Sequence, residues 1–536
     1  MMCTRVLSQA VNRIVRHGPS AVGTLLMVVG NLAAQTGVAP SAACQSLTSL
    51  QVPGVVLAVT KAEWMAAGST PPAGPGGAAS AIKLPAYCRL DGVIDRRTGK
   101  GGVTYGIGFA LALPEVWNGR FLLQGGGGLN GSVQFPLGAV GAGGQPGLAR
   151  GFAVASTDTG HEGRGGFDGS FQQDQQASLD FAYVAIGRVA EIAKRIVGQY
   201  YGKAPDHSYF AGCSTGGREA MLMAERYPTY FDGIVAGSPA MRTNFSGIGD
   251  RWVAATLNEI APKNDKGVPI TRNALSDADR KTVIDGVLKA CDAADGLKDG
   301  MVFNWQACRF DPKTLVCSGA KQDGCLSMSQ ATALEKAFAG PKDSKGRQVY
   351  PGFLFDTGIA STQGIPGLLL GGASPVGPAF TDIGMDVDAA AERAMSDPAA
   401  SVSETSRWTN LNTFLGHGGK LIFFHGISDP WFSALDTVDY YERMTKANGG
   451  EQVRQSSRLF LSPGMGHCGG GPAALDTFDA LSAVVGWVEQ GVAPDSLRAT
   501  GRAFPGRSRP LCAYPLHAQY KGEGNPEDAG SFECRP

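Results

Sequence analysis

The stretch SYFAGCSTGGREAM, Ser208 to Met221, is the most informative part of this chain. Its apolar first half, up to Gly212, is typical of a short buried strand, and the residues after Gly216 are typical of a helix. Between them stands a Gly-x-Ser-x-Gly pattern centred on Ser214. With 76 glycines in 536 residues, such a pattern arises roughly once by chance, so its flanks decide its meaning. They predict the sharp strand-to-helix turn that presents a nucleophilic serine, against the alternative of a glycine-rich turn with an inert serine.

Similar short apolar runs occur on both sides of this stretch. Helical patterns separate several of them, over 178–201 and 217–227. Strands that alternate with helices indicate an α/β fold, with a mostly parallel sheet covered by helices on both faces. The predicted strands are Phe121–Gln124, Phe152–Thr157, Ser208–Gly212, Gly233–Gly237, Leu421–Gly426 and Arg458–Pro463.

The alternation of strands and helices stops in the middle of the chain. Residues 245–407 read as a loop-rich insertion with few buried strands, which we expect to lie over the carboxyl edge of the sheet as a lid. Residues 44–244 and 408–536 would then form the catalytic domain. The sequence makes no prediction of oligomeric state.

Composition limits the possible partners. Lysine plus arginine and aspartate plus glutamate both number 47, so no net charge favours nucleic acid or an anionic membrane. Residues 1–34 carry Arg5, Arg13 and Arg16 before a short apolar run, which is typical of a signal peptide; an N-terminal amphipathic helix is the alternative. The run falls short of the about 20 residues that span a bilayer. We therefore expect a secreted or periplasmic protein that is free of the membrane once its leader is removed.

A nucleophilic serine needs a base and an acid, which in this arrangement follow the serine in the chain, each just after a later strand. Asp429 follows the strand that ends at Gly426, and His467 follows the strand that ends at Pro463. His161 follows the correct end of a strand but precedes the serine, so it is expected only to line the site. His425 is expected to support the loop, and the rival acid Asp436 falls within a predicted helix, 433–444.

The cysteines indicate disulfides. Of eleven, Cys3 lies in the predicted leader, which leaves ten, an even number. Zinc ligation is the alternative, but no Cys-x-x-Cys pair is present. If Ser214 and His467 are in contact, their neighbours Cys213 and Cys468 come within the about 5 to 6 Å that a disulfide needs between Cα atoms. The sequence thus predicts a Cys213–Cys468 bond that holds nucleophile and base together, with a free thiol at Cys213 as the alternative.

Two further motifs suggest ligand contacts. The backbone N–H of Thr215 and the loop GGGGLNG, Gly125 to Gly131, could bind the oxyanion of an ester undergoing attack. The loop could also be a phosphate cradle, although it lacks the Gly-Lys-Ser/Thr ending. The segment CDAADGLKDGMV, Cys291 to Val302, holds three aspartates that would suit Ca²⁺, or would form an acidic surface turn.

From about Cys44 to the C-terminus the chain resembles the tannase and feruloyl esterase family. The specific marks are Cys213-Ser214, Asp429 and His467-Cys468, supported by YFDGIVAGSPA, HGISD, FSALDTVDYYER and PGMGHC. The resemblance implies a Ser/His/Asp esterase with an α/β-hydrolase core, a lid and no organic cofactor. It further implies four more disulfides, Cys44–Cys88, Cys291–Cys308, Cys317–Cys325 and Cys512–Cys534; structural calcium held by the side chains of Asp292, Asp295 and Asp299 and the carbonyls of Leu297 and Met301; Gly128 as the second oxyanion donor; and Phe432 in the acyl pocket.

The lid affects the expected substrate. Members that hydrolyse mono(2-hydroxyethyl) terephthalate hold the free carboxylate with a lid arginine, but the lid here is shorter between about Gln348 and Arg407. Arg393 and Arg407 are candidates for that arginine, and neither matches it specifically. We therefore expect a small ester of an aromatic acid, of feruloyl or galloyl type, to be cleaved through an acyl-enzyme. The alternatives are a terephthalate monoester hydrolase, a non-catalytic calcium-stabilised binding protein on the same scaffold, and acyl transfer to an alcohol.

Overall fold

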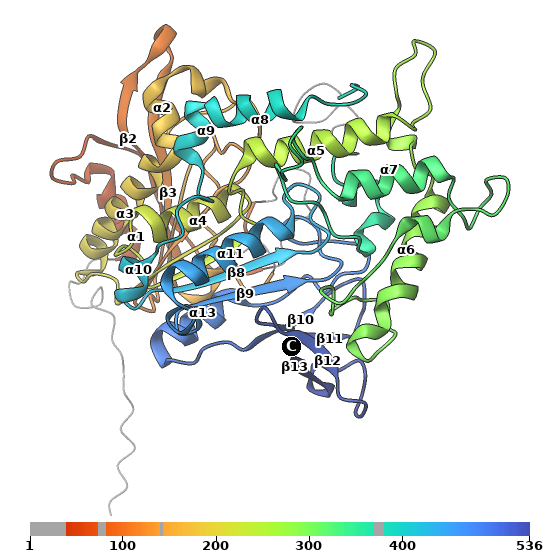
Figure 1. Ribbon diagram of the computed structural model, residues 1–536. Helices are drawn as coiled ribbons and strands as arrows, with labels where there is room; N and C mark the ends of the chain where they lie inside the picture. The colour runs from red at the N-terminus through yellow and green to blue at the C-terminus, as the bar shows by residue number, and fades with distance from the viewer. Residues whose placement is uncertain (1–38, 73–81, 140–142, 369–379) are drawn as a thin grey trace, which may run out of the picture.

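A nine-stranded sheet forms the centre of the protein (Figure 1). The computed structural model describes residues 39–72, 82–139, 143–368 and 380–536, so the predicted leader and Cys3 lie outside the described residues. The strand order is β1-β2-β3-β5-β4-β6-β7-β8-β9. The strands of this sheet are β1 (Leu57–Met65), β2 (Tyr87–Thr98), β3 (Thr104–Pro114), β4 (Arg120–Gln124), β5 (Ala153–Thr157), β6 (His207–Cys213), β7 (Gly233–Gly237), β8 (Lys420–Gly426) and β9 (Ser457–Ser462).

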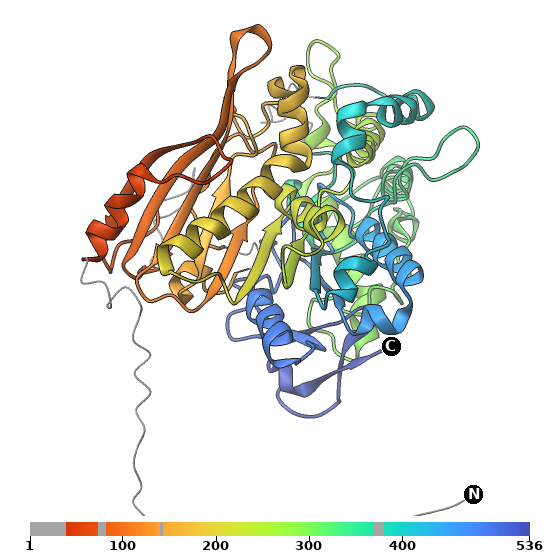
Figure 2. The same cartoon turned by 90° about the vertical axis from the view of Figure 1, so that its left-hand side faces the viewer.

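Strands β4 to β9 are parallel to one another, and they include every predicted strand, which confirms the α/β fold. The antiparallel strands β1, β2 and β3 were not predicted; they join the sheet beside β5. Figure 2 shows these strands on one side of the molecule, with the β2–β3 hairpin extending past the rest of the sheet.

Side chains alternate between two hydrophobic cores, one on each face of the sheet. On β6, Phe210 packs into one core, whereas Tyr209 and Ala211 pack into the other. Helices α3, α4 and α11 cover the first face, and α13 with the C-terminal strands covers the second, as Figure 1 shows for α11 and α13. The helices are α1 (Pro40–Ser46), α2 (Gln175–Leu179), α3 (Ala185–Tyr201), α4 (Thr215–Arg226), α5 (Thr243–Asn258), α6 (Asp277–Cys291), α7 (Met328–Phe338), α8 (Val387–Ser396), α9 (Pro398–Ser403), α10 (Asn412–Gly416), α11 (Ala434–Asn448), α12 (Gly450–Arg454) and α13 (Ala480–Gln490).

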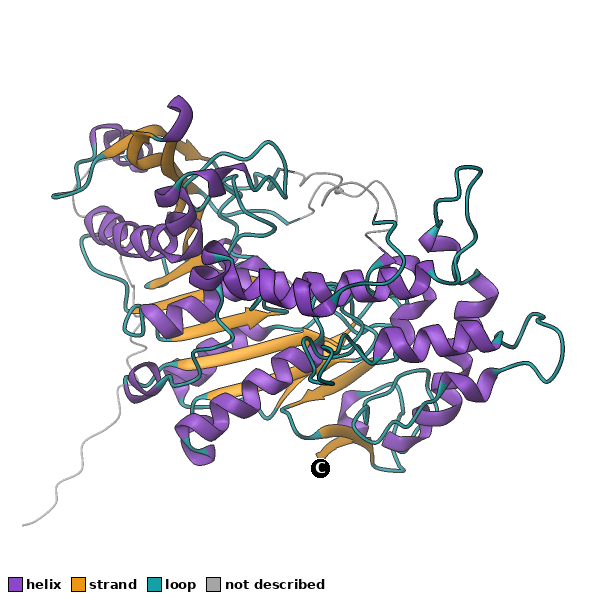
Figure 3. Ribbon diagram, turned by 45° about the horizontal axis from the view of Figure 1, so that its top comes forward, coloured by secondary structure: helices purple, strands orange, loops and turns teal. Residues whose placement is uncertain are grey.

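In the part of residues 245–407 that the structure describes, the predicted loop-rich lid contains the α-helices α5 to α9, and therefore has more regular structure than we expected. Helices α5, α6 and α7 lie beyond the carboxyl ends of β8 and β9, and Figure 3 shows this side of the molecule built of helices and loops. The region has a core of its own, in which Val253, Leu334 and Phe338 are buried. Helix α5 crosses the predicted boundary at residue 245, and the division into domains stays a prediction.

The C-terminal segment forms two small antiparallel sheets, β10 (Ser496–Thr500) with β11 (Ser508–Cys512) and β12 (His517–Tyr520) with β13 (Phe532–Arg535). Among the described residues, no helix is both long and apolar enough to cross a membrane.

Candidate active site

Ser214 occupies the sharp turn between β6 and α4. Its backbone has φ 64° and ψ −123°, a conformation that costs a non-glycine residue about 1 to 3 kcal/mol. Neighbouring glycines make the turn possible, because a Cβ on Gly212 would lie 2.5 Å from the carbonyl oxygen of Gly216, and one on Gly217 would lie 2.2 Å from that of Gly237. The predicted turn is therefore present, and it places the half-buried serine at the carboxyl edge of the sheet.

All five predicted disulfides are formed. Cys213 and Cys468 are bonded with their Cα atoms 5.9 Å apart. This bond joins the residue before Ser214 to the residue after His467, across 255 positions of sequence. The remaining pairs are Cys44–Cys88, Cys291–Cys308, Cys317–Cys325 and Cys512–Cys534.

Asp429 and His467 are in direct contact. Nδ1 of His467 lies 2.8 Å from Oδ2 of Asp429. The other oxygen of Asp429 accepts the N–H groups of Trp431 at 2.9 Å and Phe432 at 3.1 Å. Burial alone would raise the pKa of the Asp429 carboxyl, but the charges and hydrogen bonds of His467 and His425 outweigh burial and hold the pKa below its ordinary range. The carboxylate therefore stays ionised and fixes the orientation of the imidazole.

His425 supports this loop, as predicted. It is fully buried, and its Nε2 lies 3.0 Å from the carbonyl oxygen of Phe432 and 3.2 Å from Oδ2 of Asp429. Because both neighbours are acceptors, the proton must be on Nε2. Its Nδ1 lies 2.9 Å from Oγ1 of Thr437, on α11.

Asp356 connects the lid region to both loops that carry the acid and the histidine. The residue is buried, and its Oδ2 accepts Oγ–H of Ser428 at 2.8 Å and N–H of Gly464 at 2.6 Å. Ser428 directly precedes Asp429, and its Oγ also accepts the N–H of Gly358 at 3.1 Å. One carboxylate therefore holds the acid loop and the histidine loop against each other.

The side chain of Ser214 is held by fewer hydrogen bonds than those of Asp429 and His467. Within the described part of the chain, Oγ of Ser214 has no hydrogen-bond partner, so the expected bond to His467 is not made in this structure. Such bonds are often long or poorly aligned before substrate binds. The disulfide next to both residues nevertheless keeps them on neighbouring backbone segments.

The two predicted oxyanion donors lie on adjoining segments. Oγ1 of Thr215 donates to the carbonyl oxygen of Gly128, and N–H of Gly216 donates to that of Gly126 at 3.1 Å. Gly128 has φ 58°, and a Cβ there would lie 2.2 Å from the carbonyl oxygen of Gly166. In the described residues, the N–H groups of Gly128 and Thr215 donate to no protein acceptor and could therefore bind an oxyanion.

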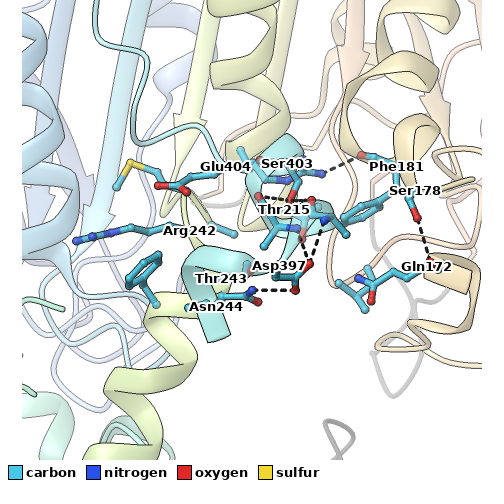
Figure 4. Close-up of a pocket in the computed structure, with 18 of the residues that line it drawn as sticks. Gln172, Ser178, Phe181, Thr215, Arg242, Thr243, Asn244, Asp397, Ser403 and Glu404 are labelled. Carbon is cyan, nitrogen blue, oxygen red and sulfur yellow. Dashed lines mark hydrogen bonds between the residues drawn. The ribbon is translucent and has the colours of Figure 1, made fainter. Parts of the chain in front are cut away.

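A pocket that Thr215 helps to line lies between the oxyanion loop, α5 and α9 (Figure 4). Its apolar walls include Leu129, Phe171, Phe181, Met241 and Phe245, and its neutral polar groups include Gln172, Ser178 and Asn244.

Two arginines line this pocket, and both have partners. Arg218 donates to the carbonyl oxygens of Ala182 at 2.9 Å and Phe181 at 3.1 Å. Arg242 pairs with Asp436, and Figure 4 shows its side chain extending away from Thr215. The inner pocket therefore suits a neutral ring rather than an anion.

The other residues predicted to line the site are Phe432, His161, Arg407 and Arg393, and their contacts differ. Phe432 packs edge-to-face on His467, with ring centroids 5.2 Å apart. His161 is buried behind the pocket wall and stacks on Phe171 with ring centroids 3.9 Å apart. Arg407 pairs with Glu404 at 3.0 Å. Arg393 lies on α8 and, with Arg251, lines an outer cavity that shares Asn244 and Asp397 with the inner pocket.

The predicted calcium loop follows α6. Asp292 accepts N–H of Gly300 at 3.1 Å, Asp295 accepts N–H of Phe303 at 3.1 Å, and the carboxylate of Asp299 pairs with the buried Arg509. Among the described residues no three acidic, histidine or cysteine side chains converge on a point that could hold a metal. The loop offers the oxygen donors that Ca²⁺ prefers, and in this structure its carboxylates accept backbone N–H groups or pair with an arginine.

Sequence reasoning missed Glu219 and Asp356. Glu219 is an acid within the buried face of α4, and an acidic residue in the run REAMLMA could have been noticed. Asp356 has no sequence signal, because its partners are 72 and 108 positions away.

Comparison with known proteins agrees with this geometry. A strand-turn-helix serine, an Asp–His pair and an oxyanion loop on a mostly parallel sheet define an α/β hydrolase of the ester-cleaving class. Residues 88–367 and 379–535 match the family model described as "Tannase and feruloyl esterase". The chain therefore belongs to the tannase and feruloyl esterase family, and it is a carboxylic ester hydrolase.

Three relatives illustrate the range of the family. The chain is 38% identical to a mono(2-hydroxyethyl) terephthalate hydrolase of Piscinibacter sakaiensis, over 85% of this chain and 86% of that protein. It is 31% identical to a probable feruloyl esterase B-2 of Aspergillus terreus, over 78% of this chain and 82% of that protein. The crystal structure of feruloyl esterase B from Aspergillus oryzae matches with a TM-score of 0.74 at 26% identity, covering 93% of this chain and all of that one.

Proposed function

We propose that the protein is an exported serine esterase that cleaves esters of aromatic acids, of feruloyl or galloyl type, through an acyl-enzyme. One observation carries the proposal: His467 is bonded to Asp429 and is tied to Ser214 through the adjoining disulfide. The names of the feruloyl esterase relatives support the substrate class.

Each step of the reaction has a candidate group. Oγ of Ser214 attacks the ester carbonyl carbon, and its proton passes to Nε2 of His467, while the ionised Asp429 stabilises the resulting imidazolium. The carbonyl oxygen gains negative charge, which the N–H groups of Gly128 and Thr215 bind. His467 then protonates the departing alcohol, and a water molecule that loses its proton to the same nitrogen hydrolyses the acyl-enzyme.

The pocket supports an uncharged aromatic acyl group. Phe171, Phe181 and Leu129 offer apolar contacts for a ring, whereas Gln172 and Ser178 could bind its hydroxyl or methoxy substituents. Both arginines of the inner pocket are already engaged. A terephthalate monoester is the second candidate, because the relative from Piscinibacter sakaiensis carries that name and the outer cavity holds Arg251 and Arg393.

A substrate panel tests the proposal. Hydrolysis of methyl ferulate, methyl gallate and mono(2-hydroxyethyl) terephthalate would be compared for the wild type, Ser214→Ala and the exposed control Ser344→Ala. We expect the gallate or ferulate ester to be preferred, the control to match the wild type, and Ser214→Ala to be inactive. A preference for the terephthalate ester would refute the substrate assignment. Failure of a serine-directed phosphonate to label Ser214 would favour a binding protein, and ester products formed with added alcohol would favour acyl transfer.

We also propose that structural calcium binds at Asp292, Asp295 and Asp299 with the carbonyls of Leu297 and Met301. The all-oxygen donor set supports it. A chelator should lower the unfolding temperature, and added Ca²⁺ should restore it, whereas Mg²⁺ should not; an unchanged unfolding temperature would contradict calcium binding.

Export to a periplasm or to the medium is supported by the five disulfides, which form in oxidising compartments. N-terminal sequencing of the mature protein should find cleavage near residue 34. A mature chain that retains its first residues would contradict this prediction.

A further inference from the structure

A single buried carboxylate holds the loop that carries the second oxyanion donor. Glu219 lies on α4, the helix that begins at Thr215, and is 1% exposed. Its Oε2 accepts N–H of Gly126 at 2.9 Å, and its Oε1 accepts the side-chain N–H of Asn130 at 2.6 Å. These partners stand on either side of Gly128, so the carboxylate spans both ends of the loop tip.

The loop and the helix are in close backbone contact at the same place. A Cβ on Gly216 would lie 2.7 Å from the carbonyl oxygen of Gly126, and one on Gly126 would lie 2.5 Å from the amide of Asn130. Asn130 has φ 51°, and its own N–H donates to the carbonyl oxygen of Gly127 at 2.9 Å. The glycines allow this approach but supply no side chain to hold it, and Glu219 supplies that link.

Burial of a carboxylate at this position costs free energy, because the charge loses its contact with water. Glu219 forms no salt bridge within the described part of the chain; the positive charge of its buried neighbour Arg218 acts on it, and Ala220, Met221 and Met223 of α4 are buried apolar residues. An apolar side chain would avoid the desolvation of a charge, but it could not accept two N–H groups at once. The two hydrogen bonds to the loop therefore explain the carboxylate, whereas packing in the core does not.

We propose that Glu219 is a positioning residue of the oxyanion hole. It holds the N–H of Gly128 at a fixed distance from the N–H of Thr215, so that both can reach the same oxygen. This inference rests on the proposed function, because it assumes that Ser214 is acylated by an ester.

The first test exchanges the carboxylate for an amide of equal size. In Glu219→Gln the amide oxygen can accept one of the two donors, whereas its NH₂ group faces the other donor and repels it. Outright loss of an oxyanion donor lowers kcat by about 10²- to 10³-fold. We expect displacement of one donor to lower kcat by roughly 10- to 100-fold, with a much smaller change in KM.

A double variant should restore the link. When Glu219→Gln is combined with Asn130→Asp, the new amide can donate to the new carboxylate, while its oxygen accepts from Gly126. We expect kcat to recover at least tenfold over Glu219→Gln alone. Glu225→Gln, on the same helix and without a hydrogen bond to the loop, is the matched control and should keep wild-type kcat.

The decisive measurement compares two inhibitors. An arylboronate forms a tetrahedral adduct whose oxygen occupies the oxyanion hole, whereas the product acid does not require both donors in that geometry. Glu219→Gln should weaken boronate binding at least tenfold and leave affinity for the product acid within about twofold. Equal weakening of both inhibitors, an unchanged kcat, or no recovery in the double variant would overturn the proposal.

If Glu219→Gln does not fold, Asn130→Gly gives the same comparison. Glycine tolerates the positive φ at that position, and the substitution removes only the side-chain donor to Oε1 of Glu219. We expect kcat and boronate affinity to fall together, and wild-type values of both would overturn the proposal. The proposed function is tested separately, because a wild type that hydrolyses no ester and is not labelled at Ser214 refutes the esterase mechanism before any Glu219 variant is compared.

Discussion

Replacing Cys213 and Cys468 together by alanine should damage both activity and stability. The bond closes a loop of 255 residues, and the chain-entropy model gives a ceiling of about 5.5 kcal/mol for a loop of that length. The Cys291–Cys308 and Cys317–Cys325 bonds lie inside the loop but shorten it too little to change this value. With an unfolding entropy of about 2.1 cal/mol/K per residue, the double variant should unfold roughly 5 °C lower than the wild type.

The activity should fall for a separate reason. Ser214 and His467 make no direct hydrogen bond, so the disulfide is the link that holds their backbones together. We expect kcat for an activated aromatic ester to fall at least tenfold, on the order expected when reacting groups lose their alignment.

A matched control is Cys44→Ala with Cys88→Ala, which opens a disulfide of 44 positions between α1 and β2. The same model gives this pair a ceiling of about 4 kcal/mol, so stability should fall by a similar amount. Because that bond is remote from the serine, kcat should not change. Wild-type kcat in the Cys213/Cys468 variant, or an equal loss of kcat in the control, would refute the positioning role of the catalytic-site disulfide.

Three further substitutions follow from the structure. Asp429→Asn should lower kcat on the order of 10⁴-fold, because an amide cannot stabilise the charged imidazole; a loss below tenfold would contradict the assigned acid. Asp356→Ala should lower both the unfolding temperature and kcat, since it leaves a buried hydroxyl and a buried N–H without their acceptor, and a change in temperature alone would contradict its link to the catalytic loops. Burial raises the pKa of Asp158 to about 7, against about 3.9 in an unfolded chain. The folded state therefore keeps this proton between about pH 4 and 7, and up to about 4 kcal/mol of stability is lost as the pH rises through that range. In Asp158→Asn that loss should disappear. The unfolding temperature of the variant, relative to that of the wild type, should therefore be higher at pH 8 than at pH 4.5. A difference that stays constant over this range would contradict the raised pKa of Asp158.

The parallel strands could be predicted because each is an apolar run that is buried on both faces, as Phe423 and Phe424 show on β8. The strand β3 was missed because Gly106 and Gly108 interrupt its apolar run and resemble turn signals. In the structure they allow close packing, since a Cβ on Gly108 would lie 2.2 Å from the carboxylate of Asp158. The lid helices α6 and α7 were missed although Ser276 and Ser327 begin capping boxes that sequence reading could have used.

The candidate site likewise contains residues that have a local sequence signal and residues that have none. Ser214 and His467 carry local signals, because each follows a strand and stands beside a cysteine. Asp356 acts through partners that are distant in sequence, and no local pattern marks it. Glu219 also has distant partners, and its one local signal is an acid within the apolar run of α4. Pocket residues such as Phe171 depend on how a loop folds over the sheet, which neither hydrophobic period nor turn chemistry specifies.

The aspartate that the lid region places between the acid loop and the histidine loop limits how substrate preference can be engineered. Lids are obvious segments to exchange between relatives, since they contact the variable part of a substrate. In this protein the segment 356–358 supplies hydrogen bonds to the catalytic loops through Asp356 and Gly358. A chimera that imports a foreign lid should therefore retain these three native residues, or choose a donor lid that offers a carboxylate at the same place.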